Sequence, residues 1–124
     1  MGDWISSLTV GLPVADLWEA TEWYRAVFGS RPVLDPAPGV REFEVVPHTW
    51  LQLLASEQEV RSAFVVRIGV GDIEAEYERV RELGIDPSPI HTVSGVVRYF
   101  DFHDPYGNRL SFYQVIQDPP ERTA

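Results

Sequence analysis

The chain carries one sequence pattern twice, and this repeat restricts the folds open to it. Residues 12–17 read LPVADL, and residues 68–73 read IGVGDI. In each copy an apolar alternating stretch leads to an aspartate, then to an amphipathic segment, and then to a glycine, Gly29 or Gly84. Because repeated patterns of this kind mark repeated supersecondary units, the sequence predicts two similar modules.

Hydrophobic periodicity predicts the elements of the first module. Apolar residues occupy every second position of residues 8–14, which indicates a strand, and Asp16 then caps a helix. Two antiparallel strands are expected at 41–46 and 50–54, joined by a turn near residues 47–49.

The second module repeats the scheme. A strand is expected at 64–70, a helix begins after Asp72, and a hairpin joins 96–103 to 109–116. The hairpin register that places 103 opposite 109 also gathers four apolar side chains on one face. These are Phe100, Phe102, Leu110 and Phe112.

Length and composition favour one domain built from both modules. The 124 residues are 44% hydrophobic, enough for a single core. We expect one domain over 1–124, with module one at 5–55, a linker at 56–62, module two at 63–117 and a tail at 118–124. The shortness of the linker suits exchange of modules between two chains.

Charge and residue usage exclude several classes of function. The formal net charge of −9 argues against a nucleic-acid partner, and no apolar stretch is long enough to span a membrane. Without cysteine the chain has no disulfide and no thiolate chemistry. The N-terminus has no signal-peptide pattern, so we expect a soluble cytoplasmic protein.

Several motifs together resemble the vicinal-oxygen-chelate superfamily, which includes glyoxalase I, bleomycin-resistance proteins and extradiol dioxygenases. The motifs are the helix end WYRAVFG at 23–29, the hairpin DPYGNRL at 104–110, and the two module openings. The resemblance implies an α+β fold of two βαβββ modules. Their mixed sheets would curl around one cavity, with the helices outside, commonly in a homodimer.

In metal-dependent members the resemblance places four ligands, usually His, Gln or Glu, on the cavity face. The matching positions here are Thr9, Gln52, Val65 and Ser111. Only Gln52 is of a type used in the family, and valine has no donor atom. We therefore expect no metal and no other cofactor, and keep a divalent metal as the alternative.

The three histidines do not have metal-ligand spacing. His48 falls at a hairpin turn, His91 in a proline-rich loop and His103 beside the Asp-Pro turn. His103 alone is expected on the cavity face, as a polar ligand contact or a general base.

Strand alternation predicts which side chains face the cavity. Carboxylates and aromatic rings occur together there, a combination that suits a cationic or aromatic organic ligand. The predicted ligand-binding residues are Glu42, Glu44, Trp50, Gln52, Arg67, Tyr99, Asp101, His103, Ser111 and Tyr113. The structural alternative is that Glu44 or Asp101 pairs with Arg67 or Arg98.

Two functions of different classes follow. The first is a metal-free binding protein that sequesters a cationic or aromatic natural product, for antibiotic resistance or self-protection. The second is an enzyme of glyoxalase, epimerase or dioxygenase type, with a divalent metal or with His103 and Asp101 as acid–base groups. A catalytically silent accessory protein is a third possibility that the sequence does not separate from the first.

Overall fold

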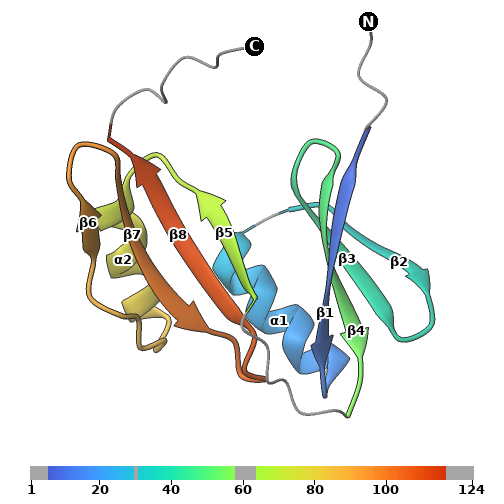
Figure 1. The fold of residues 1–124 in the computed structure, drawn as a ribbon. Helices are drawn as coiled ribbons and strands as arrows, with labels where there is room; N and C mark the ends of the chain where they lie inside the picture. The colour runs from blue at the N-terminus through green and yellow to red at the C-terminus, as the bar shows by residue number, and fades with distance from the viewer. Residues whose placement is uncertain (1–5, 30, 58–63, 117–124) are drawn as a thin grey trace, which may run out of the picture. The chain divides into compact units, whose positions relative to one another are not determined.

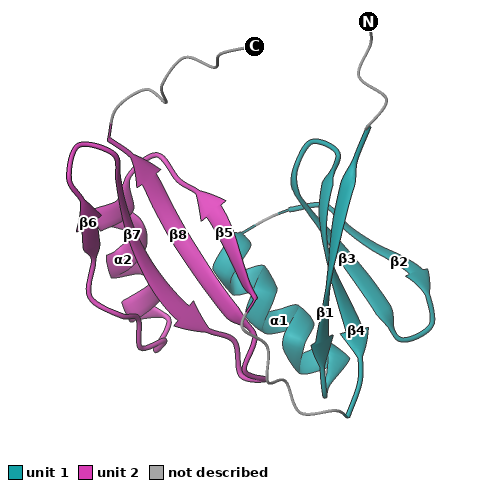
Figure 2. Cartoon of the chain, in the orientation of Figure 1, with its two compact units in different colours: residues 1–60 teal, residues 61–124 magenta. Residues whose placement is uncertain are grey.

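The computed structural model describes residues 6–29, 31–57 and 64–116. The chain divides into two compact units, residues 1–60 and 61–124 (Figure 2). Most of the predicted linker and the whole predicted tail lie outside the described residues. Each unit contains a strand, a helix and three further strands in that order (Figure 1), which confirms the predicted α+β class and the two βαβββ modules.

Unit 1 is a four-stranded mixed sheet with one helix. The strands follow the order β1-β4-β3-β2, and β1 is parallel to β4. The elements are β1 (Leu8–Val14), α1 (Leu17–Phe28), β2 (Val33–Ala37), β3 (Val40–Val46) and β4 (Thr49–Ala55).

Unit 2 has the same topology. Its strands follow the order β5-β8-β7-β6, and β5 is parallel to β8. The elements are β5 (Val65–Gly69), α2 (Ile73–Glu82), β6 (His91–Val93), β7 (Val97–His103) and β8 (Arg109–Val115).

The repeated aspartates start both helices, as predicted. Asp16 Oδ1 accepts the N–H of Glu19 at 3.0 Å, and Asp72 Oδ1 accepts the N–H of Ala75 at 3.1 Å. Each bond satisfies a backbone donor that the first helical turn leaves free. At the other end of α1, Gly29 has a φ of 74°, a conformation that glycine adopts without steric cost.

One face of each sheet packs against its own helix. In unit 2 the predicted register is confirmed, because His103 pairs with Arg109 and Asp101 with Ser111. The four apolar side chains predicted to share a face are all buried, and the Tyr77 ring of α2 lies 5.1 Å from the Phe100 ring. In unit 1, Phe43 lies beneath Tyr24 of α1 in the same way, with ring centroids 6.4 Å apart.

Two strands that the βαβββ plan implies were not located by the residue pattern. β2 contains Pro36, and its pairing with β3 is irregular between Leu34 and Ala37, so the segment resembles a turn in sequence. His91, expected in a loop, instead begins the short strand β6, which pairs with β7. Both strands lie at a sheet edge, where proline and short length are tolerated. In the described ranges, neither helix is long and apolar enough to cross a membrane.

Asp104 organises the turn between β7 and β8. Its carboxylate accepts the backbone N–H groups of Tyr106 and Asn108, both at 2.8 Å, and the side-chain amide of Asn108 at 2.7 Å. Asp104 and Asn108 are both buried. The turn motif therefore has a structural role that fixes the hairpin register.

Replacing Asp104 should cost more stability than removing a helix cap. Asp104→Ala leaves buried donors without their acceptor, so we expect the free energy of unfolding to fall by about 2–3 kcal/mol. Asp72→Ala should lower it by about 1 kcal/mol. Urea unfolding followed by circular dichroism measures both, with the exposed Asp86→Ala as control. Equal effects of all three substitutions would contradict this role for Asp104.

Candidate functional site

The face of the unit 2 sheet opposite α2 carries three rows of side chains, each row running across β5, β8 and β7. Strand pairing sets the rows, because Cα partners on neighbouring strands project from the same face. From one end of the sheet to the other they are Gly69–Tyr113–Tyr99, Arg67–Ser111–Asp101 and Val65–Arg109–His103.

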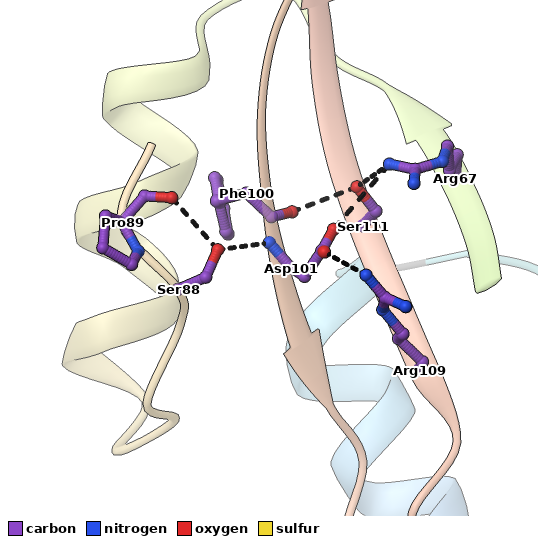
Figure 3. A network of polar contacts seen from close by, with 7 residues as sticks. All are labelled: Arg67, Ser88, Pro89, Phe100, Asp101, Arg109 and Ser111. Carbon is purple, nitrogen blue, oxygen red and sulfur yellow. Dashed lines mark hydrogen bonds and ion pairs between the residues drawn. The ribbon is translucent and has the colours of Figure 1, made fainter. Parts of the chain in front are cut away.

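The middle row forms a connected polar network (Figure 3). Arg67 Nη1 donates to Ser111 Oγ at 2.9 Å and lies 3.7 Å from Asp101 Oδ1. The Ser111 hydroxyl in turn donates to the backbone oxygen of Phe100 at 3.1 Å. From the next row, Arg109 Nη2 donates to Asp101 Oδ2 at 2.7 Å. The buried serine thus joins Arg67 to β7.

Asp101 is the acidic centre of this network. Its backbone N–H donates to Ser88 Oγ at 2.9 Å, and its carbonyl accepts the Ser88 N–H at 2.8 Å. Burial acts to raise the pKa of the Asp101 carboxyl, but the hydrogen bond from Arg109 and the charges of Arg109 and Arg67 together outweigh burial and lower it. The carboxylate is therefore ionised at neutral pH and paired with arginine.

Aromatic rings form the row beside the network. Tyr99 and Tyr113 are Cα partners, and the Arg67 guanidinium carbon lies 5.2 Å from the centre of the Tyr99 ring, within cation–π range. A Cβ atom at Gly69 would lie 3.3 Å from the Tyr113 hydroxyl. The absence of a side chain at Gly69 therefore lets the Tyr113 ring extend over β5.

The corresponding face of unit 1 is acidic. One row is Gly11–Gln52–Glu42 and the next is Thr9–Trp50–Glu44. Gln52 Nε2 donates to Glu42 Oε1 at 2.6 Å, and Glu44 Oε2 accepts the backbone N–H of His48 at 3.3 Å. Within the described parts of the chain, neither carboxylate is paired with an arginine.

The ten predicted ligand-binding residues thus fall into two groups, one on the face of each sheet opposite its helix. Glu42, Glu44, Trp50 and Gln52 belong to unit 1, and the other six belong to unit 2. Their role in binding remains a prediction. The structural alternative for Asp101 was an ion pair with Arg67 or Arg98. The structure contains the pair with Arg67, whereas Arg98 pairs with Glu74 at 2.9 Å.

Arg109 was not among the predicted site residues, although it holds Asp101 most closely. The two residues are diagonal neighbours across β7 and β8, so the predicted register contained the signal. His103 is exposed, and its side chain has no hydrogen bond or ion pair with any other described residue. The acid–base pair proposed for His103 and Asp101 is therefore not joined by a direct contact here.

At two of the four positions that the resemblance assigns to metal ligands, the residues present do not fit a divalent metal. Val65 has no donor atom, and the Ser111 hydroxyl is engaged with the Phe100 carbonyl and the Arg67 cation. Gln52 donates from Nε2 to Glu42 Oε1, which leaves Gln52 Oε1 as the one ligand atom of a type that the family uses. Across the described residues, no group of three or more His, Cys, Asp or Glu side chains is arranged to hold a metal ion.

Comparison with known proteins identifies the family. Residues 5–112 match the model of the glyoxalase/bleomycin resistance protein/dioxygenase superfamily. The chain therefore belongs to this superfamily, as its motifs suggested. No curated protein matches the chain.

Solved structures share the fold at low sequence identity. The fosfomycin resistance protein FosX from Listeria monocytogenes has a TM-score of 0.75 and 19% identity, over 92% of this chain and 94% of that one. A lactoylglutathione lyase from Agrobacterium tumefaciens has a TM-score of 0.71 and 20% identity, over 86% of this chain and 91% of that one. A glyoxalase/bleomycin resistance protein from Catenulispora acidiphila has a TM-score of 0.73 and 24% identity, over 88% of this chain and 97% of that one. At these identities the likeness establishes the fold alone.

The paired Asp101 should make stability depend on acid pH. Because the pKa of Asp101 is lower in the folded protein, the ionised carboxylate stabilises the fold at pH values above the pKa of the unfolded chain, near 3.8. This contribution is lost as the pH falls through the pKa of the folded protein. We expect Asp101→Asn to be less stable than the unmodified protein at pH 7, with a gap that narrows below about pH 4. Urea unfolding across pH measures the gap, with Asp86→Asn as control. A gap of constant size from pH 7 to pH 3 would contradict the ion-pair role.

Proposed function

We propose that this protein binds an aromatic organic molecule without a metal and holds it without chemical change, as a sequestering member of its superfamily. Antibiotic resistance or self-protection would be the biological use. The observation that carries the proposal is the middle row of unit 2. There the buried Ser111 stands where the resemblance places a metal ligand in metal-dependent members, and its hydroxyl is bonded to Arg67. An arginine bound to Ser111 brings a fixed positive charge to this region and opposes a second cation.

The aromatic residues on the two faces support the choice of ligand. Tyr99 and Tyr113 lie side by side in unit 2, and Trp50 is half-buried on the unit 1 face. Rings of this kind provide flat apolar surfaces against which an aromatic ligand stacks. The unit 1 face, taken by itself, carries Glu42 and Glu44 beside Gln52 and Trp50, and their negative charge favours a ligand with a cationic group.

Removing one tyrosine should weaken binding without unfolding the protein. With bleomycin and other aromatic antibiotics as probes, we expect Tyr99→Ala to raise Kd about three- to tenfold, since an aromatic pair contributes about 0.5–1.5 kcal/mol. Titration calorimetry makes the measurement, and Trp18→Ala is the control, because that ring is 72% exposed on α1. No binding of any antibiotic, together with no protection of cells that express the protein, would overturn the proposal.

A metal-dependent enzyme is the second candidate. It is favoured by fold relatives such as a FosX from Listeria monocytogenes whose structure contains Mn(II) and sulfate. Elemental analysis of protein purified without chelator or affinity tag separates the two candidates. We expect far less than one divalent metal per chain and antibiotic binding that EDTA does not alter. A stoichiometric metal would favour the enzyme.

A homodimer, with or without exchanged modules, also remains a prediction. The superfamily resemblance motivates it, and sedimentation equilibrium of the full chain tests it. The expected result is a mass of twice 14.1 kDa.

A further inference from the structure

The polar network on the unit 2 face places two guanidinium groups beside one carboxylate (Figure 3). Arg109 Nη2 lies 2.7 Å from Asp101 Oδ2, whereas Arg67 Nη1 lies 3.7 Å from Asp101 Oδ1. Electrostatic attraction falls with distance, and Arg109 makes the close hydrogen bond. The negative charge of Asp101 therefore neutralises the charge of Arg109 more than that of Arg67. This face therefore carries positive charge, although the whole chain has a formal net charge of −9.

Arg67 is positioned mainly by neutral groups. Its Nη1 donates to the Ser111 hydroxyl, which is itself fixed by the Phe100 carbonyl, and its guanidinium lies over the Tyr99 ring. The side chain is 43% exposed. In the described ranges its other N–H groups have no hydrogen-bond partner. The guanidinium is thus held by fixed partners on a side chain that remains partly exposed.

The repeat shows that the sheet does not require an arginine at this position. In unit 1 the equivalent row has Gly11 in place of Arg67, and Gln52 bonds directly to Glu42 at 2.6 Å. The neighbouring strands pair in the same parallel manner in both units. Parallel pairing of these strands therefore does not by itself require an arginine at position 67.

We propose that Arg67 binds the carboxylate of an aromatic acid, whose ring stacks against Tyr99 or Tyr113. This inference rests on the proposed binding function and names the ligand class for the unit 2 face. A guanidinium presents paired N–H groups that match the two oxygens of a carboxylate. The row that contains Tyr99 and Tyr113 is adjacent to the row that contains Arg67, so one planar ligand would contact a tyrosine ring and the guanidinium together. The carboxylates of Glu42 and Glu44 on the unit 1 face favour cations, and the unit 2 face has the opposite preference.

The experiment compares three probes that share one ring system. These are 2-naphthoate, its neutral isostere 2-naphthamide and the cationic 2-naphthylmethylamine. Backbone NMR shifts on the full chain give Kd and report whether β5 and β8 respond. We expect 2-naphthoate to bind about tenfold more tightly than 2-naphthamide, the difference that one charge-assisted interaction provides.

Arg67→Gln should remove this preference by weakening the binding of 2-naphthoate much more than that of 2-naphthamide. Gln retains a donor for Ser111, which protects the fold, and Arg67→Lys should keep part of the preference because it retains charge without the fork geometry. Arg98→Gln is the matched control, because Arg98 lies on β7 but pairs with Glu74 of α2.

The outcomes separate the two proposals. A preference for 2-naphthoate that persists in Arg67→Gln, or equal binding of all three probes, overturns the carboxylate site and leaves aromatic binding standing. Binding of none of the probes overturns the carboxylate site, and the antibiotic titrations then decide the proposed function separately.

Discussion

The parallel pairing of the first strand with the last strand of each unit is the constraint on which the candidate site depends. It places β5 beside β8, so that Arg67 and Ser111 become neighbours although the helix and two strands separate them in sequence. A parallel pair needs a long connection, and here α2 and the β6–β7 segment provide it. The buried phenylalanines between sheet and helix hold this pairing together, and every polar row on the opposite face takes its order from them.

The two units share a backbone plan and differ in the chemistry of one face. Gly11, Gln52 and Glu42 of unit 1 correspond to Arg67, Ser111 and Asp101 of unit 2. A duplicated scaffold separates folding from function in this way, because the helix-facing side must stay apolar while the other side is free to vary. Superfamily membership therefore fixes the architecture, and the individual side chains on the free faces determine what is bound.

The sequence predicted local elements well and long-range contacts less well. The β7–β8 register followed from alternation, because a shift of one residue would have exposed Phe100 and Phe102. The edge strands β2 and β6 were missed, since an irregular, exposed strand has little hydrophobic pattern to detect. The bond from Arg67 to Ser111 was also beyond prediction. It depends on which residues of two distant strands become partners, and periodicity within each strand does not contain that information.

Local and overall charge act on a ligand at different distances. An anion that approaches this chain first meets an acidic molecule, which slows association at low ionic strength. At physiological ionic strength the Debye length is about 8 Å, so distant carboxylates are screened. A guanidinium in direct contact is screened much less, and the ligand then responds to Arg67 and its immediate neighbours. An acidic protein can therefore hold an anion-binding group on one sheet face, and the net charge alone is a poor guide to the charge of its ligand.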